Sequence, residues 1–124
     1  MRKYLLLLLA LLCEYGYAYD SRVDEKILGK VISSPGNDPQ RAFDSDPDTY
    51  FQANGDEMKW VGLELDTTYV VTRIAFRPMN SSQGEDNMLL SVFEGANRPD
   101  FMDAVPLYLI GEKPSRYGMT TIDV

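Results

Sequence analysis

Histidine is absent from the 124-residue sequence, and cysteine occurs only once, at Cys13. Imidazole and thiolate groups are the usual ligands of zinc and haem iron, and they supply the base or nucleophile of catalytic triads. Cys13 lies in a segment that we expect to be removed, so the remaining chain has neither group. These absences exclude most catalytic chemistry and favour a protein that is not an enzyme.

Basic residues are also scarce, with 12 Lys and Arg against 19 Asp and Glu and a net charge of −7 at pH 7. Phosphate backbones and anionic membrane surfaces repel such a chain, so we expect no nucleic-acid partner. The longest apolar run, Tyr4–Leu12, is shorter than the roughly 20 residues that cross a bilayer, so no membrane span is predicted. The length fits one domain.

The first residues have the pattern of a secretory signal peptide. Two basic residues precede the apolar run Tyr4–Leu12, and the small residues Gly16 and Ala18 follow it at the positions that a signal peptidase requires. We therefore expect Met1–Ala18 to be cleaved. This predicts a secreted, periplasmic or cell-surface protein.

Cys13 leaves a second possibility open, because a bacterial lipoprotein keeps its leader cysteine as a lipidated first residue. Leu12 stands where the lipoprotein pattern has a small residue, which favours cleavage after Ala18. Beyond the leader, Tyr19–Lys26 is polar without a period and is predicted to be a flexible lead-in.

The rest of the chain, Ile27–Val124, reads as short strands between turns, which is typical of an all-β sandwich or barrel. Val61, Leu63 and Leu65 alternate onto one face, whereas Arg73 and Arg77 are expected to face solvent. Strands are predicted at Trp60–Leu65, Val70–Arg77, Leu89–Phe93, Leu107–Ile110 and Thr120–Val124, with loops at Ser33–Gln40, Gln52–Lys59, Met79–Asn87 and Gly111–Gly118.

The last predicted strand has no obvious partner in the sequence, and it runs to Val124 without a turn or polar tail. We therefore expect a domain that is incomplete at its C-terminus, although a short natural terminal strand is an alternative.

Carboxylates alternate at Asp44, Asp46 and Asp48, and a hydroxyl follows at Thr49. Hard oxygen ligands at this density suit Ca²⁺. The spacing does not match an EF-hand loop, because position 6 is Thr49 and position 12 is Gly55. A solvated acidic turn built on Asp46 and Pro47 remains the alternative.

Several segments together resemble the discoidin domain, also called the coagulation factor 5/8 type C domain, which overlaps with family 32 carbohydrate-binding modules. The resemblance covers Ile27–Val124. It rests on the order and spacing of Ile32–Ser34, Ala42–Phe51, Trp60–Leu65, Val71–Ile74 and Phe93–Asn97.

The resemblance implies a galactose-binding-like, jelly-roll β-sandwich with a structural calcium. It would assign side-chain oxygens of Asp44 and Asp46, the hydroxyl and carbonyl of Thr49 and the backbone carbonyl of Arg41 to the metal. A glutamate ligand of the family would lie beyond the last residue of this sequence. The family usually has Gly where this chain has Ser45, so we expect Ser45 in a backbone conformation that Gly reaches more easily.

The resemblance also implies a non-catalytic, secreted module that targets a larger protein to a carbohydrate or glycoconjugate. An extracellular adhesion or protein–protein interaction module is the alternative, and other domains of a longer parent protein are possible partners. Glu64 and Glu94 are not expected to form a glycosidase pair, because both lie on predicted strands. The ligand-binding candidates, against which a plain solvated loop is the alternative, are Asn80, Gln83, Glu85, Asn87 and Phe101.

Overall fold

The structure, a computed structural model, describes residues 2–8 and 25–124. Most of the predicted leader, with Cys13, and the predicted lead-in up to residue 24 lie outside the described residues. In the part that is described, no helix is long and apolar enough to cross a membrane.

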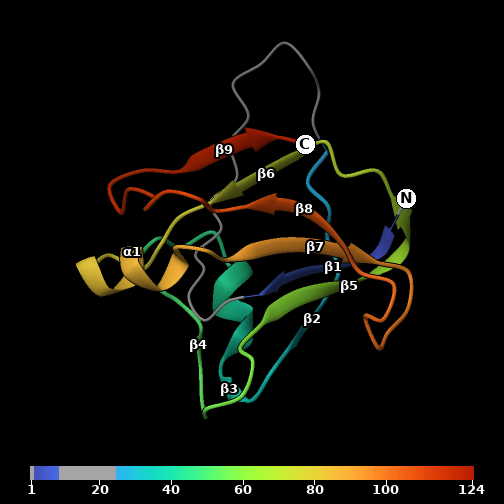
Figure 1. The fold of residues 1–124 in the computed structure, drawn as a ribbon, viewed down its shortest axis with the longest axis horizontal. Coiled ribbons are helices and arrows are strands. Elements are labelled where there is room, and N and C mark those ends of the chain that lie inside the picture. The colour runs from blue at the N-terminus through green and yellow to red at the C-terminus, as the bar shows by residue number, and fades with distance from the viewer. Residues whose placement is uncertain (1, 9–24) are drawn as a thin grey trace.

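One layer of the molecule is a five-stranded sheet in which every neighbouring pair of strands is antiparallel (Figure 1). In spatial order its strands are β2 (Lys30–Ser33), β5 (Val61–Tyr69), β1 (Arg2–Leu8), β7 (Val92–Ala96) and β8 (Val105–Leu109). The sheet therefore has a strand from the start of the chain at its centre, between strands that are distant in sequence.

Two short antiparallel ribbons complete the strands that the structure describes. The first joins β6 (Arg73–Phe76) to β9 (Thr120–Asp123), and the second joins β3 (Gly36–Asn37) to β4 (Gln52–Ala53). The chain also forms a 3₁₀ helix, η1 (Pro39–Phe43), and one α-helix, α1 (Ser82–Met88). Because β6 pairs with β9, the expectation that the terminal strand lacks a partner was wrong.

The core lies between the β6–β9 ribbon and the face of the large sheet. Val61, Leu63 and Leu65 are buried on β5, as their alternation predicts. Across from them Phe76 of β6 is 1% exposed, and its ring lies 5.3 Å from that of Phe93 on β7. These contacts hold the two layers together as a sandwich.

The five strands predicted from the sequence are all present, with shifted ends, and the all-β expectation is confirmed. One predicted loop was wrong, because Met79–Asn87 contains α1. The helix begins where the Ser81 hydroxyl accepts a hydrogen bond from the Gly84 N–H at 3.0 Å. This capping contact stabilises a helix that is too short to show a 3.6-residue period in the sequence.

Candidate functional site

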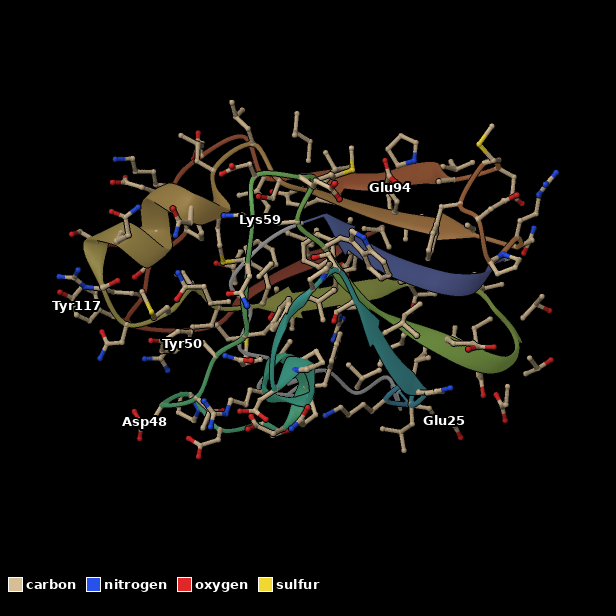
Figure 2. All side chains as sticks on the ribbon, turned by 90° about the horizontal axis from the view of Figure 1, so that it is seen from below. Glu25, Asp48, Tyr50, Lys59, Glu94 and Tyr117 are labelled. Atoms are coloured by element: carbon tan, nitrogen blue, oxygen red, sulfur yellow. The ribbon has the colours of Figure 1, made fainter. Side chains whose placement is uncertain are left out.

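Helix α1 and the segment between β8 and β9 meet at one end of the sandwich (Figure 2). Gly84 is buried on the inner side of the helix, and a Cβ atom there would lie only 2.4 Å from the Met79 carbonyl oxygen. Glycine at this position therefore lets the helix pack directly on the chain that precedes it. The close packing fixes the outer side chains of α1 relative to the sheet.

Arg116 is the central side chain of this end. Its guanidinium lies 3.7 Å from the Glu85 carboxylate, and its N–H donates to the same carboxylate at 3.3 Å. The Arg116 and Glu85 side chains are only 27% and 23% exposed. From β6, Arg77 donates to the Arg116 carbonyl oxygen at 2.9 Å. Arg77 is therefore half-buried and holds this segment, and the expectation that it faces solvent was wrong.

Tyr117 presents its ring to solvent next to Arg116. The residue is 74% exposed, and its hydroxyl accepts a hydrogen bond from the Arg116 guanidinium at 2.7 Å. The guanidinium carbon also lies 4.9 Å from the centre of the Tyr117 ring. Figure 2 shows Tyr117 and Tyr50 at this same end of the molecule. An exposed ring beside a positioned guanidinium can stack on one face of a ligand and donate hydrogen bonds to its oxygens.

A second ion pair ties α1 to the same segment. Lys113 contacts Asp86 at 2.5 Å, and this hydrogen bond raises the pKa of Lys113 above its ordinary value. Both side chains are more than half exposed, so the contact adds little stability. Its effect is to limit the positions that the segment carrying Tyr117 can take.

The structure brings four of the five predicted ligand-binding residues together. Asn80 lies in the bend before α1, and the other three lie on the helix itself, where Gln83 donates to Asn87 at 2.9 Å. Glu85 points to Arg116, as described above. The sequence reasoning did not find Arg116 and Tyr117. An adjacent basic and aromatic pair in a polar loop was the available signal.

Phe101 lies apart from the other candidates, because α1 precedes β7 and Phe101 follows it. Its ring packs edge to face on Trp60, with 5.6 Å between the ring centroids. Trp60 is half-buried, as expected of a residue at the edge of the core. The structure therefore places Phe101 against the protein's own aromatic ring and not in the group around α1.

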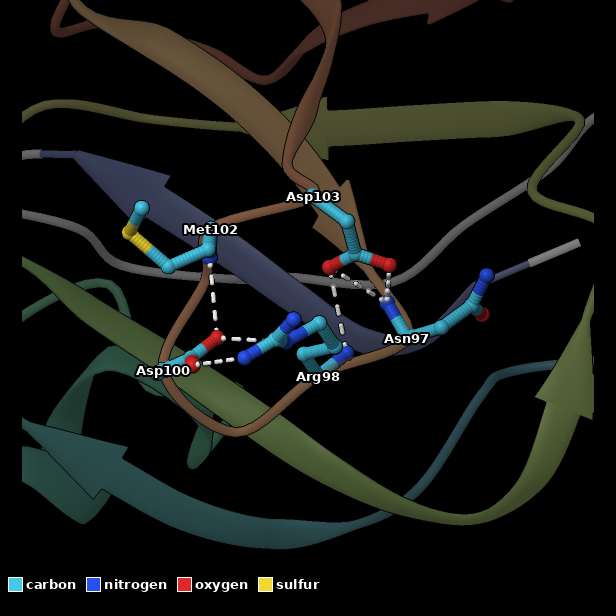
Figure 3. A network of polar contacts seen from close by, with 5 residues as sticks. All are labelled: Asn97, Arg98, Asp100, Met102 and Asp103. Atoms are coloured by element: carbon cyan, nitrogen blue, oxygen red, sulfur yellow. Dashed lines mark hydrogen bonds and ion pairs between the residues drawn. The ribbon is translucent and has the colours of Figure 1, made fainter.

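Two carboxylates hold the β7–β8 loop around Phe101 (Figure 3). Asp103 accepts hydrogen bonds from the backbone N–H groups of Asn97 and Arg98, and Asp100 accepts from the Met102 N–H and the Arg98 guanidinium. Phe101 has a φ of 57°, which is a strained conformation for an aromatic residue. The carboxylate contacts offset this strain.

The loop is expected to respond to acid through Asp100. The Arg98 guanidinium, with the Met102 N–H, lowers the pKa of Asp100 below its ordinary value. A lowered pKa in the folded state stabilises the fold above the ordinary value, about 4, and this stabilisation is lost as the pH falls through the folded value. Emission from Trp60, the only tryptophan, should therefore stay constant down to about pH 4 and change below it.

The matched variant is Asp100→Asn, which cannot ionise and should lack this component of the emission change. An identical acid titration in both proteins would show that another group controls the loop.

The predicted calcium residues form a compact turn after η1. The Asp44 carboxylate accepts from the Asp46 N–H at 2.9 Å and from the Thr49 hydroxyl at 2.5 Å. The same hydroxyl lies 3.2 Å from the Asp46 carbonyl oxygen. Ser45 has a φ of 62°, which confirms the expectation that it takes a glycine-like conformation.

The turn fits a calcium ion in part. Oxygens of Asp44, Asp46 and Thr49 converge, and Arg41 lies in the last turn of η1 just before them. However, no group of three or more carboxylate, imidazole or thiol side chains gathers anywhere in residues 2–8 and 25–124. A metal here would therefore need carbonyl and hydroxyl oxygens besides the carboxylates, which Ca²⁺ accepts.

Comparisons with known proteins bear on this arrangement. No protein-family model and no curated protein matches the chain. Among solved structures, the chain is similar to CBM62 from Clostridium thermocellum Xyl5A, with 37% sequence identity and a TM-score of 0.70. The match covers 82% of this chain and 77% of that chain. The similarity confirms the galactose-binding-like, jelly-roll β-sandwich expected from the sequence.

Proposed function

Because the chain belongs to the CBM62 family of carbohydrate-binding modules, we propose that it binds a carbohydrate at the α1 end and has no catalytic activity of its own. The family supports the galactose-binding-like, carbohydrate-binding part of the expected resemblance and does not point to the discoidin domain in particular. We further propose that the module is exported and that it targets a larger protein to glycans.

The observation that carries the proposed site is the combination of Tyr117 with Arg116. Sugar rings have an apolar face that packs on aromatic rings and hydroxyls that accept hydrogen bonds from guanidinium groups. Tyr117 is exposed enough to stack, while Glu85 and Arg77 hold Arg116 in place. A shallow site with one stacking ring predicts affinity on the order of millimolar, or about 4 kcal/mol, so attachment would depend on several modules acting together.

The experiment is a glycan screen of the full chain, followed by titration of the strongest binder against variants. Tyr117→Ala should weaken binding by about tenfold or more, which corresponds to about 1.4 kcal/mol of lost stacking. Tyr117→Phe keeps the ring and loses the hydrogen bond from Arg116, so it should retain most of the affinity.

Phe101→Ala is the second aromatic variant, because it removes a ring that packs on Trp60 outside the α1 end. Binding should be unchanged in this variant. Loss of binding in Phe101→Ala with full binding in Tyr117→Ala would place the sugar at the β7–β8 loop. A blank screen together with capture of a defined protein would favour the adhesion module instead.

Calcium is the second part of the proposal. We propose that Asp44, Asp46, Thr49 and the Arg41 carbonyl hold a structural Ca²⁺ that braces the turn after η1. The convergence of the Asp44, Asp46 and Thr49 oxygens supports this assignment. The ion would add to the stability of the folded module and would take no part in chemistry.

A further inference from the structure

Strand β1 lies at the centre of the large sheet, between β5 and β7 (Figure 1). On one side Leu7 pairs with Val61 of β5, and on the other side it pairs with Phe93 of β7. The backbone of one segment therefore supplies hydrogen-bond partners to two strands at once.

The same segment is part of the predicted signal peptide. Cleavage after Ala18 would remove β1 and divide the sheet into the pairs β2–β5 and β7–β8. Strands β5 and β7 stand two strand spacings apart, about 10 Å, which far exceeds the 3 Å of a hydrogen bond. The main-chain groups of two central strands would then lack partners, which is costly inside a sheet. The place of β1 must be filled again for the sheet to persist.

The rows beside this place define what can fill it. Val61 and Phe93 face each other across position 7 of β1, and they are 0% and 5% exposed. Leu63 and Gly95, both buried, face each other across position 5. Directly paired residues of antiparallel strands point to the same face, so alternate positions of any occupant lie in these buried rows. The occupant must therefore be extended and apolar at alternate positions.

The position of Val124 shows where such a segment can enter. The Val124 N–H donates to the Thr72 carbonyl oxygen at 3.0 Å. Thr72 follows Tyr69 by three residues, and Tyr69 pairs with Arg2, the first residue of β1. Three residues span at most about 10 Å. A chain that continues from Val124 can therefore reach the end of the sheet where β1 begins and run in the direction of β1, antiparallel to both neighbours.

We propose that the place between β5 and β7 is a strand-binding site whose ligand is an extended peptide segment with apolar residues at alternate positions. Arg2–Leu8 fills the site while the leader is attached. After export, a segment that continues from Val124 replaces it. The leader is thus a temporary strand of the fold, and the exported module depends on a second strand supplied from its other end.

The test moves the strand to the other end of the chain. The sequence of Arg2–Leu8 is attached after Val124 through a Gly/Ser linker of about four residues, and residues 1–18 are omitted. Thermal unfolding and hydrogen exchange are measured for this protein, for the full chain, and for the chain that starts at Tyr19 without the added strand. The moved strand should give a cooperative transition within about 5 °C of the full chain, with protected amides in the added segment.

The chain without the strand should unfold at least about 15 °C lower or lose its cooperative transition. Two proline variants serve as controls, Leu6→Pro in the full chain and the same change in the moved strand. Both should lose the stability gained from the strand, because proline has no N–H and does not fit a central strand.

Three results would overturn the proposal. The chain from Tyr19 could be as stable as the full chain, or the proline variant of the moved strand could be as stable as the moved strand itself. A moved strand that leaves the protein unfolded, or that makes it a dimer on a sizing column, would show that the site is not filled from Val124 within one chain.

Discussion

Replacing Phe76 by Ala is expected to lower the free energy of unfolding by about 3–5 kcal/mol. The Phe76 ring is almost completely buried, and it packs against Phe93 on β7 and, at 6.3 Å, against Tyr108 on β8. Ala leaves a cavity where the β6–β9 ribbon meets the large sheet. A domain of this size has only about 5–15 kcal/mol of stability, so the variant should melt at least about 12 °C lower than the parent.

Denaturant unfolding of both proteins measures this effect, with Leu109→Ala as the control. Leu109 lies on β8 of the same sheet but is 52% exposed, so its replacement should cost less than about 1 kcal/mol. Arg77 follows Phe76 directly and holds the Arg116 carbonyl. Phe76→Ala should therefore also lose sugar binding at temperatures where Leu109→Ala binds normally. A stability loss below 1 kcal/mol in Phe76→Ala would contradict the packing described here.

The sequence predicted those elements whose residues carry their own signal. Val61, Leu63 and Leu65 alternate with more polar residues, and a period of two is enough to identify a strand with one buried face. Ser45 was also predictable, because the resemblance placed it where a positive φ is required, and it has a φ of 62°. In both cases the determining feature lies within a few residues.

Helix α1 was missed because its determinants lie partly outside it. The cap is local, but the packing of Gly84 on Met79 and the ion pairs to Lys113 and Arg116 depend on tertiary structure. Seven residues cannot show a helical period against a glycine in their middle.

The candidate site was only half predictable for a related reason. Glu85 and Arg116 are 31 residues apart, and nothing in either local sequence indicates that the β8–β9 segment folds back onto α1. Arg77 was placed on a solvent face by alternation alone, whereas the structure uses it to fix the Arg116 carbonyl. Contacts between distant loops arise from strand order, which local patterns do not determine.

Calcium is expected to raise the melting temperature of the full chain by about 10 °C or more, and Asp44→Asn is expected to remove that increase. Ligand binding to the folded state adds RT ln(1 + [L]/Kd), about 2.7 kcal/mol at a hundredfold excess over Kd. For a domain of this size each kcal/mol shifts the melting temperature by several degrees. Asp44 is central to the turn, because its two carboxylate oxygens contact the Asp46 N–H and the Thr49 hydroxyl.

Thermal unfolding in chelator and in millimolar Ca²⁺ measures both effects. In chelator Asp44→Asn should melt close to the parent, because the side chain is exposed and Asn can still accept a hydrogen bond. Asp48→Asn makes the same charge change in the same turn at a carboxylate outside the proposed ligand set, so it should keep most of the increase. An equal increase in Asp44→Asn would place the ion elsewhere, whereas no increase in the parent protein would mean that the turn is held by its hydrogen bonds alone.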